Sequence, residues 1–273
     1  MRAPAISRPD VPYRIDIPAP PDLALDRLVE LGALDVEPVA GGLAALMPDG
    51  VSPDTVAGAL GGAPLTCAPA TARDDGSVWL LAPRAVRVSR VVIASSGKAA
   101  APGELRLLDA AAFGTGHHPT TRLCLEALQD ILSPETPGHV LDVGTGSGIL
   151  ALAALSLGAP RAVGLDIDAE ALETARENAR LNGLAHRLLL LRGGPDAVSG
   201  TWPLVLANVL AAPLIEMAPV LARRVAKGGS LILSGISVGV EADVRRAYQR
   251  LGMHLRASEP RGGWVALVAR ASW

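Results

Sequence analysis

VLDVGTGSGILALAA, residues 140–154, runs from an apolar strand pattern through a glycine-rich turn into an apolar helix pattern. Glycines at 144, 146 and 148 permit a tight turn and let backbone N–H groups approach a ligand without interference from Cβ atoms. The dinucleotide fingerprint is G-x-G-x-x-G, whereas the spacing here is G-x-G-x-G and Ile149 follows the third glycine. The stretch therefore predicts a strand, turn and helix that bind a nucleoside-type ligand, and it counts against NAD.

Two acidic residues accompany this turn. Asp142 lies two residues before Gly144, and Asp166 ends the next strand pattern, GLDID, about 20 residues after Gly144. A carboxylate at that second point can accept hydrogen bonds from both hydroxyls of a ribose. The structural alternatives are that Asp142 caps local backbone and that Asp166 is a solvent-exposed strand end. The glycine turn and the acid together favour a nucleoside cofactor.

The same alternation of strands and helices continues outward from the turn. Helices are predicted over 120–132, 147–158, 168–183, 212–229 and 240–252, and strands over 139–144, 161–167, 186–193, 203–209 and 230–236. A closing strand pair is predicted over 255–259 and 263–270. Strands that alternate with helices form a parallel sheet covered on both faces, and the closing pair adds an antiparallel edge strand.

The amino-terminal part of the chain has a different pattern. Between residues 11 and 70, short strands and helices follow the order β-α-β-β-α-β, which predicts a small ferredoxin-like α+β domain. We therefore expect a small domain over 1–70, a linker over 71–106 that includes a strand pair in VRVSRVVIAS, and a larger α/β domain over 107–273.

Composition narrows the classes of function. The formal net charge is -2 and aromatic residues make up 3% of the chain, so we expect no direct nucleic-acid binding. Cys67 and Cys124 suggest neither a disulfide framework nor a metal site, and no apolar run approaches the ~18 residues of a membrane span. A cytoplasmic monomer without a metal or a membrane segment is the expectation.

LLDAAAFGTGHHPTT, residues 107–121, precedes the predicted helix at 120–132. Gly114 and Gly116 permit unusual backbone angles around Thr115, while Thr120 and Thr121 are good helix caps. For His117 and His118 a structural role is favoured over that of a general base, because nothing nearby supplies the acid of a triad.

Asn208 ends the strand pattern PLVLAN. It should therefore face the same crevice as Gly144 and Asp166. An amide there can donate to a carboxylate or accept from an amine, although by residue type alone a turn asparagine is the commoner role.

Four stretches, taken in order, are similar to the PrmA family, bacterial methyltransferases that modify protein eleven of the large ribosomal subunit. They are AFGTGHHPTTRLCLEAL, VLDVGTGSGILALAA, GLDIDAEALETARENARLN and LANVLAAPLIEMAP. The resemblance covers about residues 105–237 and implies a class I methyltransferase with a Rossmann-like α/β sheet. It implies that the ferredoxin-like domain over 1–70 recognises the substrate and that the domain over 107–273 is catalytic and binds the cofactor. It also implies S-adenosyl-L-methionine as the cofactor and a protein substrate whose lysine or N-terminal amines are methylated.

The resemblance further implies roles for individual residues. Thr115 and Asn208 would be catalytic, with Asn208 beside the incoming amine. The cofactor would be bound by Phe113, Gly114, Thr115, Gly116, Thr121, Asp142, Gly144, Thr145, Gly146, Asp166, Ile167 and Asn208. No side chain is clearly placed as a base, so solvent is expected to remove the proton of the amine.

The alternatives are a lysine methyltransferase acting on the β subunit of electron transfer flavoprotein, an NAD-dependent oxidoreductase, an inactive binding module, and a methyltransferase for small molecules or nucleic acids. This sequence departs from the usual family pattern at four places. His117 replaces threonine, Ala110-Ala111 replaces Pro-Gly, Thr145 replaces cysteine and Pro203 replaces aspartate.

Overall fold

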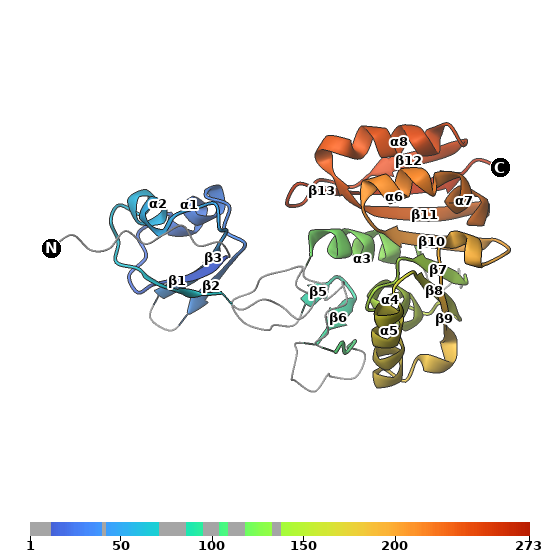
Figure 1. Cartoon of the computed structure of the whole chain (residues 1–273), viewed down its shortest axis with the longest axis horizontal. Helices are drawn as coiled ribbons and strands as arrows, with labels where there is room; N and C mark the ends of the chain where they lie inside the picture. The colour runs from blue at the N-terminus through green and yellow to red at the C-terminus, as the bar shows by residue number, and fades with distance from the viewer. Residues whose placement is uncertain (1–11, 40–41, 71–85, 95–103, 109–117, 133–137) are drawn as a thin grey trace. The chain divides into compact units, whose positions relative to one another are not determined.

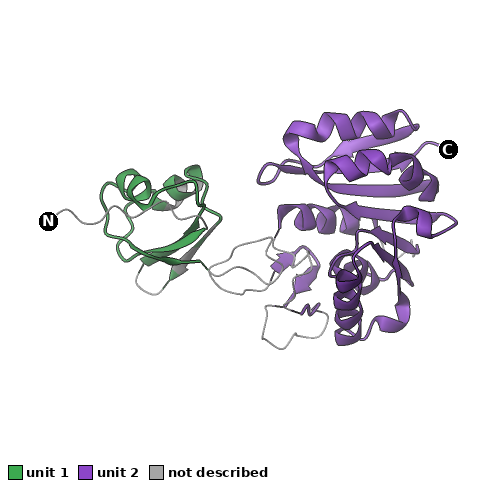
Figure 2. Ribbon diagram, in the orientation of Figure 1, with its two compact units in different colours: residues 1–83 green, residues 84–273 purple. Residues whose placement is uncertain are grey.

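The structure is a computed structural model, which describes residues 12–39, 42–70, 86–94, 104–108, 118–132 and 138–273. The chain divides into two compact units, Met1–Pro83 and Arg84–Trp273 (Figure 2). This division lies inside the predicted linker 71–106, and the three predicted domain ranges stay a prediction.

The smaller unit is an antiparallel sheet with two helices. Its elements are β1 (Tyr13–Ile17), α1 (Ala24–Glu30), β2 (Asp35–Val39), β3 (Gly42–Met47), α2 (Pro53–Ala59) and β4 (Thr66–Pro69). The strand order is β2-β3-β1-β4, and every neighbouring pair is antiparallel. The predicted β-α-β-β-α-β order and its ferredoxin-like class are thereby confirmed (Figure 1).

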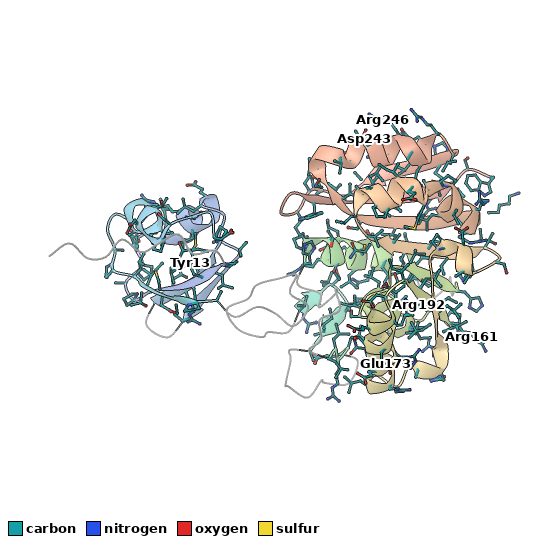
Figure 3. The ribbon with its side chains drawn as sticks, viewed as in Figure 1. Tyr13, Arg161, Glu173, Arg192, Asp243 and Arg246 are labelled. Atoms are coloured by element: carbon teal, nitrogen blue, oxygen red, sulfur yellow. The ribbon has the colours of Figure 1, made fainter. Side chains whose placement is uncertain are left out.

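Alternating burial explains the sheet of this unit. Tyr13, Ile15 and Ile17 are buried while the residues between them are partly exposed, so one face of β1 packs against the helices. The hydroxyl of Tyr13 (labelled in Figure 3) donates to the carbonyl of Val51 at 2.7 Å. Ser52 begins α2 by accepting a hydrogen bond from the backbone of Thr55 at 3.1 Å.

The larger unit begins with a strand pair that the sequence predicts. Strands β5 (Val86–Val88) and β6 (Val91–Ile93) are antiparallel. Val86, Val88, Val91 and Ile93 are buried in the same core as helices α3 (Pro119–Ile131) and α4 (Ile149–Ser156). This part of the predicted linker is therefore packed structure that belongs to the larger unit.

The larger unit is built on a seven-stranded sheet with the order β12-β13-β11-β10-β7-β8-β9. Its strands are β7 (Val140–Val143), β8 (Ala162–Asp166), β9 (Leu188–Arg192), β10 (Trp202–Asn208), β11 (Val225–Ser237), β12 (Met253–Ala257) and β13 (Trp264–Ala271). In this spatial order, the neighbouring strands β11, β10, β7, β8 and β9 are parallel to one another. Strand β13 is antiparallel to both β11 and β12. The predicted α/β class and the antiparallel edge pairing are confirmed.

Helices cover both faces of this sheet. The remaining helices are α5 (Ala169–Leu181), α6 (Ala211–Glu216), α7 (Ala218–Arg224) and α8 (Glu241–Gln249). Consecutive residues of β10 enter opposite cores: Leu204 and Leu206 pack with α3 and α4, whereas Val205 and Ala207 pack with α6, α7 and α8 (Figure 1). Burial on both sides explains why the central strands are continuous apolar runs.

The single helix predicted over 212–229 is wrong. Met217 ends α6 and begins α7, and the helical backbone stops at Val225, where β11 starts. Pro219 lacks a backbone N–H, and its ring clashes with a helical carbonyl four residues earlier, so it kinks or breaks a helix that reaches it from the N-terminal side. Val225 instead pairs with Trp202 of β10.

Tyr248 links two helices on one face of the sheet. Its side chain is fully buried, its hydroxyl donates to the carbonyl of Leu214 at 2.8 Å, and burial raises the pKa of the phenol. We expect Tyr248→Phe to lower the free energy of unfolding of the larger unit by about 1–2 kcal/mol, because the Leu214 carbonyl loses this donor inside the core.

Amide hydrogen exchange of the core strands measures this change for each unit separately. Tyr13→Phe is the matched control, since it removes a comparable hydroxyl in the smaller unit and should leave exchange in the larger unit unchanged. If amide exchange rates in the larger unit of Tyr248→Phe equal those of the wild type, the hydrogen bond from Tyr248 to Leu214 does not stabilise this unit as proposed.

Candidate active site

The carboxyl ends of the parallel strands meet around a cavity of about 640 Å³. Gly144 and Gly146 line it after β7, Asp166 and Ile167 after β8, and Asn208 at the end of β10. Three strand ends that the sequence predicts to share a crevice therefore do so. Such an edge is where open α/β sheets bind ligands.

Backbone contacts between β7 and β8 hold the glycine turn. The amides of Gly144 and Thr145 both donate to the carbonyl of Leu165, at 2.8 and 2.9 Å. Gly144 has φ +71°, and a Cβ there would lie 2.4 Å from Cγ1 of Val209. Gly148, at φ +81°, is the N-cap of α4. Glycine is therefore required at 144 both by the backbone conformation and by the neighbouring side chain.

Asp166 is fixed by two backbone donors. One carboxylate oxygen accepts from the amide of Gly146 at 2.9 Å and the other from the amide of Asp168 at 3.0 Å. Arg192 (labelled in Figure 3) donates to the carbonyl of Ile167 at 3.1 Å and so holds the chain just after β8. Each carboxylate oxygen keeps a second lone pair with which it can accept a hydrogen bond from a hydroxyl.

Asp142 lies beneath the turn rather than among the residues that line the cavity. Its Oδ2 accepts from the hydroxyl of Thr145 at 2.7 Å and from the amide of Ala151 at 3.3 Å. Burial raises the pKa of Asp142 from 3.8 to about 6, against the lowering effect of these two hydrogen bonds. This carboxylate ties the turn to the start of α4, and its predicted contact with a cofactor stays a prediction, as does that of Thr145.

Asn208 has an unmet hydrogen-bonding capacity. Its side-chain oxygen is buried and has no hydrogen-bond partner among the described residues, yet the residue lines the cavity. A buried polar atom left without a partner costs about 1–3 kcal/mol. An oxygen in this position points to a donor that a ligand supplies.

The start of α3 differs from the expectation. The helix begins at Pro119, and the N-cap is His118, whose Nδ1 accepts from the amide of Thr120 at 3.3 Å. Proline is tolerated at the first helical position, so Thr120 and Thr121 lie inside the helix, where both are buried. The imidazole of His118 also packs edge-on against Trp264, with ring centroids 5.3 Å apart. These contacts fit the structural role favoured for His118.

Several predicted site residues cannot be compared with this geometry. Phe113, Gly114, Thr115, Gly116 and His117 lie outside the described residues, so the predicted catalytic role of Thr115 and the predicted cofactor contacts of this stretch stay predictions. Thr121 is described: it is buried away from the cavity lining, and its hydroxyl has no hydrogen-bond partner in the described part of the chain.

The sequence analysis missed some residues of the cavity. Gly193 and Gly194 follow β9, Trp264 comes from β13, and Gly235 lies within β11. Gly235 has φ +84°, and a Cβ there would lie 2.1 Å from the carbonyl oxygen of Val209. A glycine inside a strand pattern such as SLILSGI indicates close backbone approach, and that was the available signal.

Comparison with known proteins identifies the family. Residues 84–272 match the family model described as ribosomal protein L11 methyltransferase (PrmA). The chain therefore belongs to the PrmA family.

Similar proteins carry the same description. A ribosomal protein L11 methyltransferase of Geobacter sulfurreducens is 51% identical over 160 residues, covering 58% of this chain and 52% of that protein. One from Geobacter metallireducens is 49% identical over 173 residues, covering 62% and 56%. The matched part of the chain spans about half the length of these curated relatives.

A solved structure agrees with these matches. The crystal structure of a ribosomal protein L11 methylase from Lactobacillus delbrueckii subsp. bulgaricus has a TM-score of 0.63 and 31% identity, covering 69% of this chain and 99% of that one.

Gly235→Ala tests the close approach at the cavity. We expect the larger unit to lose about 1–3 kcal/mol of unfolding free energy through backbone strain. Overlap of the new Cβ with the Val209 carbonyl should add a further loss. Gly228→Ala is the matched control, because Gly228 has φ +67° in the same strand but no atom near its Cβ position. Thermal unfolding of both variants measures the difference, and equal destabilisation would show that the overlap is relieved at no cost.

Asp142→Asn tests the buried carboxylate. Since the folded pKa of Asp142 is raised to about 6, the folded state binds this proton more tightly than the unfolded state. The stabilisation it brings is therefore complete below pH 3.8 and is lost as pH rises through about 6. Relative to Asp142→Asn, the wild type should lose up to about 3 kcal/mol of unfolding free energy across this range.

Denaturant unfolding of the ligand-free protein at a series of pH values measures that difference. The raised pKa would be contradicted if the unfolding free energy of the wild type minus that of the variant stays constant or increases with pH.

Proposed function

We propose that the chain is an S-adenosyl-L-methionine-dependent protein methyltransferase that modifies lysine or N-terminal amines of ribosomal protein L11. The observation that carries the proposal is the buried, unpartnered oxygen of Asn208 in a cavity shared with Asp166 and the glycine turn. Family membership and the printed names of the relatives support the same substrate. No observation favours the β subunit of electron transfer flavoprotein.

The residues of the cavity fit the proposed cofactor. A volume of about 640 Å³ lies within the range of roughly 300–1,000 Å³ typical of small-ligand sites. Asp166 can accept hydrogen bonds from ribose hydroxyls, and Gly144 and Gly146 leave the backbone open to close approach. Ile167 and Leu210 add exposed apolar surface beside them, which suits an adenine ring. When bound, the cofactor supplies a methyl group already activated on a sulfonium.

The task left to the protein is to position a neutral amine. Correct positioning of the reactants can remove a large part of the activation barrier. The Asn208 oxygen can accept an N–H of the amine and so aim the nitrogen lone pair into the cavity. A lysine amine has an ordinary pKa near ~10.4, and removal from water favours its neutral form.

The ionisable side chains among the described residues that line the cavity are Asp166 and His118. Asp166 is held by backbone amides and His118 caps α3, so we assign the removal of the proton to solvent.

The remaining expectations concern location and assembly. None of the helices in the described part of the chain has the length and apolar character that a membrane crossing requires. We propose a cytoplasmic location and a protein partner on the basis of the family. A monomeric state and the absence of direct nucleic-acid binding remain predictions.

Transfer of tritium from labelled cofactor to purified ribosomal protein L11 tests the proposal directly. Asn208→Ala should lower kcat by about 100-fold or more, because the amine loses its orienting acceptor. Gln249→Ala, an exposed amide on α8, is the matched control and should keep wild-type turnover. If the wild-type enzyme transfers no tritium to L11, the substrate assignment is wrong. If Asn208→Ala keeps the wild-type turnover, the role assigned to Asn208 is wrong.

A further inference from the structure

Asn178 is a fully buried polar residue on α5, a helix with a largely polar surface. Its Oδ1 accepts from the backbone amide of Leu108 at 2.7 Å, and its Nδ2 donates to the carbonyl of Ser147 at 2.9 Å. Leu108 offers only a donor and Ser147 only an acceptor in these contacts, so a single orientation of the amide satisfies both. One side chain thus connects two backbone segments that are distant in sequence.

The first of these segments is the glycine turn of the cavity. Ser147 lies between Gly146, which lines the cavity, and Gly148, which caps α4. A Cβ at Gly148 would lie 3.1 Å from Cβ of Ala175, so α5 packs closely against this turn. The Ser147 carbonyl is therefore tied to α5 by a hydrogen bond from Asn178.

The second segment is Glu104–Leu108, which precedes the FGTG stretch at 113–116 in the chain. Asn182, one helical turn after Asn178, accepts from the amide of Arg106 at 2.8 Å and donates to its carbonyl at 2.7 Å. Four residues of helix rise about 6.0 Å, and two residues of extended chain span about 6.6 Å. The two asparagines therefore match alternate residues of an extended segment that runs along α5.

The asparagines differ in what they join. Asn182 contacts Arg106 and the carbonyl of Asn178 on its own helix, whereas Asn178 bridges the segment to the cavity turn. We propose that Asn178 is a positioning residue that couples residues 104–108 to the glycine turn, so that occupation of the turn by a cofactor stabilises the segment that leads to FGTG. The proposal deepens the proposed function and rests on it.

Binding of S-adenosylhomocysteine, combined with amide hydrogen exchange at Leu108, tests this coupling. In the wild type, binding should slow exchange of the Leu108 amide, because the turn and the segment are ordered together. Asn178→Ala should abolish this added protection. It should also weaken the binding of S-adenosylhomocysteine by about tenfold, which corresponds to the loss of one buried hydrogen bond. Asn182→Ala is the matched control: it loosens the same segment but should keep the ligand-induced protection and bind within about threefold of wild type.

Asn178→Asp keeps the experiment decisive if the alanine variant is unstable. It has the same size and can still accept from Leu108, but it has no N–H for the Ser147 carbonyl, so the ligand-induced protection should also be lost. Wild-type protein that binds the ligand, together with Asn178 variants that behave like Asn182→Ala, would overturn the coupling alone. Wild-type protein that fails to bind would overturn both the coupling and the proposed function.

Discussion

The close approach of backbone segments at the carboxyl ends of β7, β8, β10 and β11 is the constraint on which the site depends. The amides of Gly144 and Thr145 share the carbonyl of Leu165, and Gly235 lies where any Cβ would meet the carbonyl of Val209. These contacts bring the backbone of neighbouring strand ends close together. The space that remains is the cavity, and its polar groups are those that the strand ends bring to it.

Two aspartates near this edge show how environment separates the roles of one residue type. Asp142 is buried under the turn, with its pKa raised to about 6, and it bonds Thr145 and the first turn of α4. Asp166 lies at the tip of the neighbouring strand, held by two backbone amides with lone pairs to spare. The first maintains the shape of the turn and the second is available to a ligand. Residue type and spacing alone do not distinguish them, because the difference lies in burial.

Local patterns were sufficient to predict much of the fold. The turn at 144–148, the strand that ends at Asp166 and the helix α5 that follows it all follow from residues near one another in sequence. The break at Met217 could also have been predicted, since Pro219 kinks or breaks a helix that reaches it, but this signal was overlooked.

Other features depend on packing between distant segments. The need for glycine at 235 arises from the carbonyl of Val209, and the bridge made by Asn178 joins residues 108 and 147. Trp264 reaches the cavity because β13 inserts between β11 and β12, an order that strand patterns do not specify. In each case the identity of the partner is fixed by tertiary structure. A local pattern such as the glycine in SLILSGI can indicate a close approach, but it does not identify the segment that approaches.

The central claim is that this strand-end cavity binds the nucleoside portion of S-adenosyl-L-methionine through Asp166. Calorimetric titration of the folded chain with S-adenosylhomocysteine, alongside Asp166→Ala, tests it most directly. The account predicts one ligand per chain and affinity reduced by about tenfold or more in the variant, because hydrogen bonds from the ribose hydroxyls to a charged acceptor are lost. Folded wild-type protein that takes up no ligand, or an Asp166→Ala variant that binds as tightly as wild type, would contradict it.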